Sequence, residues 1–246
     1  MPAVLAINPN TTAAVTAKVE FDLRRFAPGV DWRSATGRFG ARYITSESAF
    51  AVASHAAVDA WAEHAGAAPV DAVLLACFGD PGLFALREMS PVPVVGLAEA
   101  SMREALRIGE RFTLVTGGPR WAPMLERLAQ NLGYAHALAT VRASDMTGGQ
   151  AAENPERAVE VFSALCRQAR AEDGAEVVIL GGAGFAGLGA LVSVAAGFPV
   201  IDSVEAGAKV AARLAQGEPC PYRLPGPAAG IESIGLAPAL AARLVQ

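Results

Sequence analysis

The chain has 246 residues with 20 basic and 24 acidic side chains, a formal net charge of −4, and 52% of its residues are hydrophobic. This length and hydrophobic content support one or two packed domains and exclude a disordered or fibrous protein. An acidic chain without a run of Lys or Arg, and with only 7% aromatic residues, argues against a nucleic-acid partner.

Apolar segments typical of buried strands alternate with amphipathic segments typical of helices along most of the chain. Strands are predicted at residues 3–7, 72–76, 92–97, 111–116, 176–180 and 198–201. Helices are predicted at residues 12–26, 51–64, 98–108, 121–132 and 155–171, and a Pro- and Gly-rich loop at 217–230 precedes a last short helix. Strands that are apolar on both faces and alternate with helices predict an α/β fold with parallel sheets covered by helices.

Residues 177–201 carry no charge and are long enough to span a bilayer. They also contain six glycines and Pro199, so a strand, a loop, a short helix and a second strand are favoured over a membrane helix. The N-terminus has no basic segment of the kind that begins a signal peptide. We therefore expect a cytoplasmic protein with no membrane partner.

An internal repeat relates residues 72–86 to residues 177–191 at a spacing of 105. At that spacing Leu75, Gly79, Gly82, Leu83, Ala85 and Leu86 are matched by identical residues, and Cys77 is matched by Gly182. The repeat predicts two similar α/β/α lobes with parallel sheets of about four strands, related by a pseudo-two-fold. We assign residues 1–98 and 208–246 to lobe 1 and residues 99–207 to lobe 2, and we expect the active site in the cleft between them.

Four turns rich in Gly, Pro or Asn follow predicted strands, at residues 8–12, 77–82, 116–119 and 182–184. In parallel sheets ligands bind outside the carboxyl ends of strands, where free amides and helix dipoles favour anionic groups. The same turns are also typical of helix caps. Asp80 followed by Pro81 has the pattern of an N-cap residue and a first helical residue.

Cys77 stands at a predicted junction of strand and helix, a position that lowers the pKa of a thiol and exposes the thiolate. We therefore interpret Cys77 as functional. Cys166 lies in an apolar helical pattern typical of core packing, and Cys220 lies in the Pro- and Gly-rich loop without activating neighbours. Three distant cysteines and three scattered histidines predict neither a disulfide framework nor a metal site.

Together these segments resemble the aspartate/glutamate/hydantoin racemase superfamily, and in particular its hydantoin and allantoin racemase branch. The matching segments are residues 7–12 (INPNTT), 76–82 (ACFGDPG), 93–100 (PVVGLAEA), 111–118 and 179–184. The resemblance implies an isomerase that moves a proton at an acidic carbon of a hydantoin, allantoin or amino-acid-like substrate. Two cysteines, one from each lobe, would act on opposite faces of that small molecule, with no cofactor.

The resemblance also assigns residues. It implies that Cys77 is the first cysteine and acts as a thiol acid/base. The positions that line the substrate, several of them through backbone amides, are matched by Asn8, Phe78, Gly79, Thr116, Gly117, Gly118, Ala183 and Gly184. The second cysteine of the family is replaced here by Gly182, which predicts impaired or one-base chemistry. We expect a homo-oligomer, the usual state of small enzymes.

Three alternatives remain open. A single-cysteine decarboxylase resembling arylmalonate decarboxylase would protonate one face of its substrate, although such enzymes keep the cysteine on the second lobe. A non-catalytic relative would bind a ligand without turnover. Finally, Gly182, Gly184 and Gly187 with Asp202 match a dinucleotide fingerprint in outline, although they lie too near the C-terminus for the usual six-stranded sheet.

Overall fold

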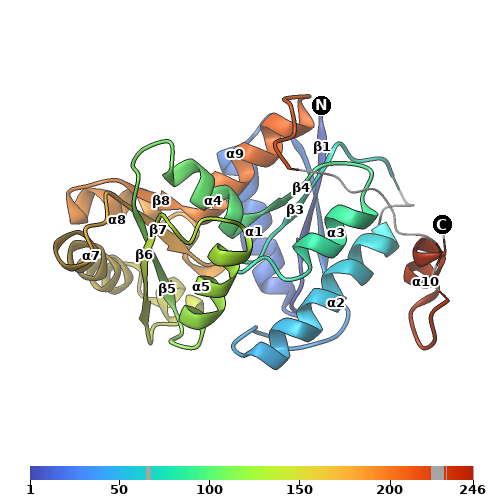
Figure 1. Ribbon diagram of the computed structural model, residues 1–246, viewed down its shortest axis with the longest axis horizontal. Coiled ribbons are helices and arrows are strands. Elements are labelled where there is room, and N and C mark those ends of the chain that lie inside the picture. The colour runs from blue at the N-terminus through green and yellow to red at the C-terminus, as the bar shows by residue number, and fades with distance from the viewer. Residues whose placement is uncertain (65–67, 223–229, 231, 246) are drawn as a thin grey trace. The chain divides into compact units, whose positions relative to one another are not determined.

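The computed structural model describes residues 1–64, 68–222, 230 and 232–245. The chain divides into two compact units, drawn in Figure 1. Unit 1 comprises Met1–Gly96 and Ala208–Gln246, and unit 2 comprises Leu97–Gly207. Residues 223–229 of the predicted loop at 217–230 lie outside the described residues.

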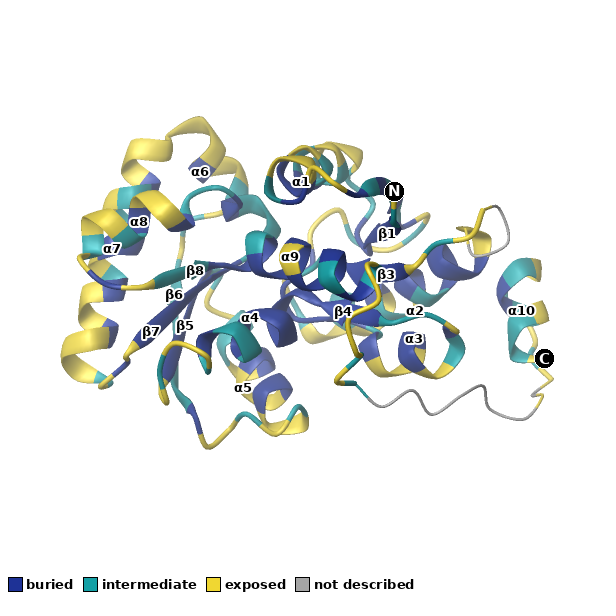
Figure 2. Ribbon diagram, turned by 90° about the horizontal axis from the view of Figure 1, so that it is seen from above, coloured by how far each residue is buried: buried dark blue, intermediate teal, exposed yellow. Residues whose placement is uncertain are grey.

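Unit 1 contains a four-stranded parallel sheet with the strand order β2-β1-β3-β4. Its strands are β1 (Ala3–Asn8), β2 (Asp31–Thr36), β3 (Ala72–Leu75) and β4 (Val94–Gly96). Every residue of the two central strands, β1 and β3, is buried, as expected for strands covered on both faces (Figure 2). Because the strands are parallel, the carboxyl ends of β1, β3 and β4 lie at the same edge of the sheet.

The helices of unit 1 cover both faces of this sheet (Figure 1). They are α1 (Ala13–Phe26), α2 (Glu47–His64), α3 (Leu83–Met89) and α10 (Pro238–Leu244). The chain passes outward from β1 to β2 through α1 and back to β3 through α2. Because parallel crossovers are right-handed, these opposite moves place α1 on one face and α2 on the other. α3 contacts α2 on that second face, and α10 also packs on α2.

Unit 2 repeats the topology of unit 1 with a parallel sheet ordered β6-β5-β7-β8. Its strands are β5 (Phe112–Gly117), β6 (Leu138–Ser144), β7 (Val177–Gly181) and β8 (Val200–Asp202). In both units the first strand in sequence pairs with the second and the third, and the fourth pairs with the third. The internal repeat in the sequence thus corresponds to two sheets with the same strand order.

The helices of unit 2 are α4 (Leu97–Ala105), α5 (Trp121–Asn131), α6 (Gly148–Glu153), α7 (Pro155–Glu172) and α8 (Gly189–Ala196), with a 3₁₀ turn, η1 (Ala183–Phe185). A further helix, α9 (Ser203–Ala215), begins in unit 2 and ends in unit 1. α7 and α8 pack together, and Phe162, Cys166 and Phe185 belong to the buried cluster beneath them. This core supports the turn that follows β7.

The predicted α/β fold with two parallel four-stranded sheets is confirmed. Two strands, β2 and β6, are absent from the sequence prediction, and both are edge strands. Their residues are mostly only partly buried, and charged side chains such as Asp31 and Arg142 interrupt the apolar pattern. The sequence therefore predicts buried central strands well and half-exposed edge strands poorly.

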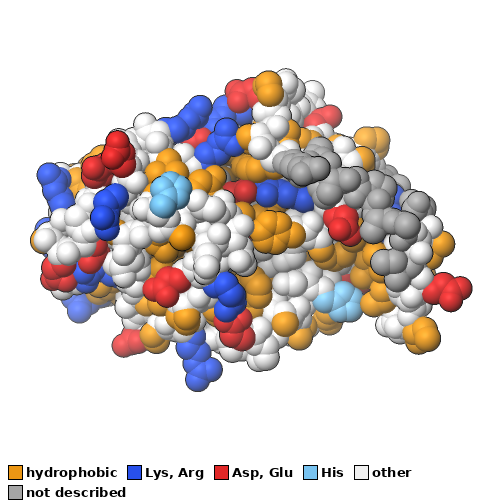
Figure 3. All heavy atoms as spheres, viewed as in Figure 1, with side chains coloured by type: hydrophobic (Ala, Val, Ile, Leu, Met, Phe, Trp, Pro, Cys, Tyr) orange, Lys and Arg blue, Asp and Glu red, His pale blue; other side chains and the backbone are white. Residues whose placement is uncertain are grey.

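The uncharged segment 177–201 folds as predicted, into β7, η1, α8 and the first residues of β8. No helix among the described residues has both the length and the hydropathy that a bilayer span requires. On the face drawn in Figure 3, basic and acidic side chains are interspersed and do not gather into a patch of one sign.

Candidate active site

Cys77 follows β3 at the carboxyl end of the unit 1 sheet. The four residues of β3 are 0% exposed, and Ala76 continues their pairing by donating its amide to Ile7 O at 2.8 Å. Cys77 is the first residue beyond this pairing and is partly exposed. The buried strand thus ends by presenting a thiol at the sheet edge where ligands bind in parallel α/β folds.

The turn after Cys77 is tight and depends on glycine. The Asp80 amide donates to Cys77 O at 3.1 Å, and Gly79 and Gly82 have φ of +132° and +85°. A Cβ at Gly82 would lie 2.8 Å from Ser54 O of α2, so no larger residue fits there. Gly82 is also the N-cap of α3, which corrects the prediction of an N-cap at Asp80. The helix begins at Leu83 and not directly after Asp80, because Gly82 still has the positive φ of the turn.

Two amides of this turn are available to a ligand. Phe78 and Gly79 are buried, and within the described residues neither amide donates to an acceptor. Buried amides almost always have a partner, so these two are well suited to an oxygen atom of a substrate. The Phe78 side chain itself is 4% exposed and packs in the core.

The electrostatics of Cys77 differ from the sequence prediction. Burial of the thiol raises its pKa above the ordinary value, and the negative charge of Asp80 raises it further. The sequence predicts a lowered pKa because helix N-termini stabilise thiolates. That prediction is wrong because burial disfavours the thiolate, the negative charge of Asp80 acts in the same direction, and α3 begins only at Leu83. Cys77 is therefore a protonated thiol at neutral pH.

Asn8, at the end of β1, makes its side-chain hydrogen bonds within the following loop. It is 1% exposed, and its Nδ2 donates to Asn10 Oδ1 at 3.0 Å and to Thr16 Oγ1 at 2.9 Å. Asn10 Oδ1 in turn accepts the Thr12 amide at 2.9 Å. Asn8 therefore holds the loop that leads into α1, and its contact with a substrate stays a prediction.

In unit 2 the turn after β5 contributes mainly to positioning. The buried Thr116 hydroxyl donates to Gly181 O at 2.8 Å and ties this turn to the end of β7. Gly118 has a φ of +90° and donates its amide to Ser144 O at 2.6 Å, so this amide already has an acceptor. Gly117 packs closely against the Phe185 ring: a Cβ at this position would lie 2.6 Å from Phe185 Cζ.

The turn after β7 carries Gly182, the residue that the internal repeat pairs with Cys77. Gly182 has φ +135° and ψ +130°, and its amide donates to Ser203 Oγ at 3.3 Å. A Cβ built on this backbone would lie 2.8 Å from Phe185 Cδ2. Phe185 is 5% exposed and stands edge-on to Phe162 with ring centroids 4.6 Å apart. A side chain at position 182 would therefore run into the core rather than toward a ligand.

The amides of Ala183 and Gly184, next in the same turn, also bind no acceptor within the part of the chain that the structure describes. Both residues are partly exposed. Unit 2 thus offers backbone donors at the end of β7, whereas the only thiol in either turn belongs to unit 1. Sequence reasoning missed the contribution of Ser203 and Phe185 to this turn, since both contacts depend on tertiary structure.

The acidic residue that the dinucleotide alternative requires, Asp202, makes structural hydrogen bonds instead. The Asp202 carboxylate accepts the amides of Gly187 at 2.6 Å, Val204 at 3.0 Å and Glu205 at 3.2 Å. It is 4% exposed, and burial raises its pKa above the ordinary range. Asp202 thus caps α9 and holds the loop before α8, so its oxygens are not available to a ribose.

Of the other two cysteines, Cys166 has the core-packing role that the sequence predicts. Cys166 is 0% exposed within the core cluster, and burial raises its pKa to about 12. Cys220 is partly exposed and its Sγ lies 3.6 Å from Tyr222 O. No group of three or more His, Cys, Asp or Glu side chains in the described residues is arranged to hold a metal ion.

The chain is similar to known proteins both in sequence and in fold. The family model described as Asp/Glu/Hydantoin racemase matches residues 4–211. A hydantoin racemase from Rhizobium meliloti is 35% identical over 211 residues, covering 85% of this chain and 86% of that protein. The crystal structure of allantoin racemase from Pseudomonas fluorescens superposes with a TM-score of 0.82 at 33% identity, covering 87% of this chain and 91% of that one.

Unliganded arylmalonate decarboxylase superposes with a TM-score of 0.63 at 22% identity, covering 89% of this chain and 94% of the decarboxylase. This likeness shows a shared fold and nothing about activity. The family match spans most of the chain and includes both turns described above. The chain belongs to the Asp/Glu/hydantoin racemase family.

Proposed function

We propose that this protein transfers a proton at the acidic carbon of a hydantoin, an allantoin or an amino-acid-like substrate, without a cofactor and at one face only. The observation that carries the proposal is the position of Cys77, a partly exposed residue at the carboxyl end of β3, in a member of a racemase family. Hydantoin racemases at up to 35% identity support the substrate class.

Cys77 would act as both base and acid on the same face. In the forward step the thiolate, which is the minor form of Cys77 at neutral pH, removes the proton from the acidic carbon. The C–H electron pair moves onto the adjacent carbonyl oxygen to give an enolate. The thiol then exchanges its proton with solvent and returns one to the same carbon, which restores the C–H bond and the thiolate. The cycle is balanced and leaves the configuration of the carbon unchanged.

Backbone amides would stabilise the enolate. The buried amides of Phe78 and Gly79 are donors without a protein acceptor among the described residues, next to the residue that removes the proton. Fixed donors aimed at developing negative charge are typically a large contribution to catalysis. We propose that the amides of Ala183 and Gly184 bind further polar groups of the substrate.

Racemisation requires a second proton donor on the opposite face, and Gly182 has no side chain to supply it. A missing acid or base group is worth roughly 10²–10⁴ in rate. The backbone of Gly182 and the ring of Phe185 support this one-face proposal, since they leave no room for a side chain at that position. We therefore expect hydrogen exchange to exceed racemisation.

The proposal is tested by incubating the protein in D₂O with single enantiomers of 5-substituted hydantoins, of allantoin and of N-carbamoyl amino acids. Proton NMR follows the signal of the acidic carbon, and reactions without protein give the spontaneous rate. The proposal expects loss of this signal above the spontaneous rate for at least one substrate. Absence of enzyme-dependent exchange for every substrate would overturn it.

One observation favours a second candidate, decarboxylation. A thiol that is protonated at neutral pH suits a reaction that needs a proton donor rather than a base. Loss of CO₂ from a substituted malonate breaks a C–C bond and leaves an enolate. Cys77 would then protonate its carbon, and water would restore the thiol. Release of CO₂ from an aryl- or alkylmalonate, absent in Cys77→Ser, would support this reaction over proton exchange.

A further inference from the structure

Helix α8 lies at the surface of unit 2 but has no polar outer side. Its one polar side chain is Ser193, whose hydroxyl donates to Phe198 O at 2.9 Å. Val192 is buried, whereas Leu191 and Val194 are 56% and 85% exposed. A helix that is apolar on all sides is typically buried on all sides. The outer side of α8 therefore has the composition of a surface that another apolar surface covers.

The outward residues of α8 are Ala190, Leu191, Val194 and Ala195, all of them exposed and none of them charged. We call these four residues the α8 face. A helix of eight residues is about 12 Å long, so this face alone is smaller than the ~800 Å² that each partner of a stable complex buries. A partner that covers the α8 face must therefore also contact α7, which has 18 residues and packs beside α8 (Figure 2).

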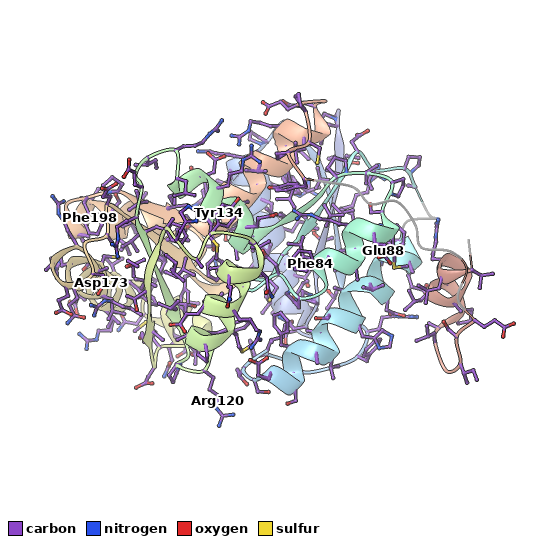
Figure 4. The ribbon with its side chains drawn as sticks, viewed as in Figure 1. Phe84, Glu88, Arg120, Tyr134, Asp173 and Phe198 are labelled. Atoms are coloured by element: carbon purple, nitrogen blue, oxygen red, sulfur yellow. The ribbon has the colours of Figure 1, made fainter. Side chains whose placement is uncertain are left out.

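Two arginines of α7 lie beside the C-terminal end of α8. Arg167 Nη1 donates to Ala195 O at 2.9 Å. The Arg170 guanidinium lies 5.5 Å from the centre of the Phe198 ring, and Figure 4 labels Phe198 just beyond the end of α8. Both arginines are exposed. Positive charge thus borders this end of the α8 face.

The same side of α7 is acidic toward its N-terminal end. Glu156 and Glu160 precede Arg167 by eleven and seven residues, spacings that return to the same side of a helix. Both are exposed, and the ion pair of Glu160 with Arg157 at 2.9 Å still leaves one more acid than base at this end. Ala164, between the acidic and basic ends, is also exposed. We call Glu156, Glu160, Ala164 and Arg167 the α7 stripe.

The charge order of the α7 stripe is complementary to a reversed copy of itself. In a two-fold dimer, residue i of one copy meets residue j of the other, and j meets i. Glu160 lies four residues before Ala164 and Arg167 lies three residues after it. Two antiparallel α7 helices that cross at Ala164 therefore bring Glu160 of each copy to Arg167 of the other. The small side chain of Ala164 permits a close crossing.

We propose that the protein forms a two-fold dimer through the α8 face and the α7 stripe of unit 2, with a second copy of the chain as the partner. The uncharged α8 faces meet near the centre and the charges of α7 surround them, as in the usual apolar centre and polar rim of an interface. A partner of one charge sign would match only one end of the stripe, whereas a reversed copy matches both. The inference does not depend on the proposed reaction.

The test is sedimentation velocity of the full chain at about 1 to 100 μM, a range that resolves micromolar dimers. Leu191→Lys places a charge in the α8 face. Ile108→Lys is the matched control, because Ile108 is 57% exposed in unit 2 and lies outside α7 and α8. Circular dichroism checks that each variant is folded.

We expect the parent chain to sediment as a dimer or as an assembly of dimers. Leu191→Lys should halve the mass or raise the Kd of the dimer about tenfold or more, because a charge buried without a partner is unfavourable. Ile108→Lys should follow the parent. A parent chain that stays monomeric would assign the α8 face to a different partner and overturn the inference. A Leu191→Lys variant with the mass of the parent throughout, or an equal loss in Ile108→Lys, would also overturn it.

Exchange of two charges tests the antiparallel arrangement. Glu160→Arg or Arg167→Glu alone brings like charges together across the two-fold and should raise the Kd of the dimer several-fold. The two substitutions combined restore opposite charges and should return the Kd toward that of the parent. A double variant that associates no better than Arg167→Glu alone would overturn the proposed pairing of α7 with its reversed copy.

Discussion

The turns after β3 and β7 have a similar backbone path but carry different side chains. Each follows a fully buried strand next to the first strand of its sheet, and each closes with a glycine at nearly the same positive φ. The first turn presents Cys77, whereas the second presents Gly182. The comparison teaches that the repeat preserves the backbone frame and leaves the reactive groups free to differ.

The turn after β7 differs from the turn after β3 in its backbone and packing, and not only in the absence of a thiol. Gly182 adopts a conformation open mainly to glycine, and Phe185 occupies the direction in which a side chain would leave. The backbone and the neighbouring core are therefore adapted to glycine. The proposed one-sided proton transfer therefore depends on the whole turn and not on residue 182 alone.

The largest effect is expected from Cys77→Ser, which replaces the thiol by a much weaker acid of similar size. Loss of a general acid/base should lower the exchange rate by roughly 10²–10⁴. Cys220→Ser is the matched control, because Cys220 is partly exposed and lies outside both turns. Exchange measured by NMR that is equal in the two variants would mean that Cys77 is not the reacting group.

The pH dependence should distinguish the thiol of the first turn from an ordinary surface cysteine. Proton removal requires the thiolate, so below the pKa the exchange rate rises about tenfold per pH unit. Burial and then Asp80 raise the pKa of Cys77, so the rise should continue through about pH 9, beyond the ordinary range of a thiol. A rate profile that levels off below about pH 8 would contradict this assignment.

Gly182→Cys tests whether the second turn can accept the missing residue. The positive φ and the clash with the Phe185 ring should destabilise the protein by about 2 kcal/mol or more. Urea unfolding followed by circular dichroism measures this change. We expect no gain in racemisation, because the new side chain would face the core.

Gly182→Cys combined with Phe185→Ala gives the control for that steric argument. The second substitution removes the ring that the new Cβ would meet, so part of the destabilisation caused by Gly182→Cys should disappear in the Phe185→Ala background. Strong racemase activity in Gly182→Cys alone would contradict the steric argument, since it would show that the turn after β7 can hold a reactive cysteine.

The smallest effect is expected from Thr116→Val, which removes the hydroxyl that ties the end of β5 to Gly181 O. The loss of one buried hydrogen bond should lower the free energy of unfolding by about 1 kcal/mol. The change is confined to unit 2, so the alkylation rate of Cys77 should stay the same. An altered Cys77 rate would mean that the two turns do not behave independently.

The sequence predicts the central strands because their residues are apolar on both faces, and the repeat of residues 72–86 then predicts two similar sheets. The edge strands β2 and β6 escape prediction because most of their residues are only partly buried and polar or charged side chains interrupt the apolar pattern. The position of Cys77 at a strand end is also predictable. The direction in which its pKa moves is not, because it depends on burial and on the placement of Asp80.

The conformation of Gly182 is equally inaccessible from the sequence. The internal repeat pairs Gly182 with Cys77, but only the backbone angles and the nearby Phe185 ring indicate that this turn leaves no space for a side chain at position 182. Both features depend on tertiary packing. Local sequence patterns therefore predict which turns form the candidate site, whereas its chemistry depends on tertiary structure.

The central claim is that proton transfer occurs on one face only. It is tested most directly by following one enantiomer of a 5-substituted hydantoin in D₂O by NMR and polarimetry in the same sample, with the spontaneous rates subtracted. The account predicts that deuterium enters the acidic carbon while the optical rotation stays constant. Loss of optical rotation at the same rate as deuterium entry would contradict it.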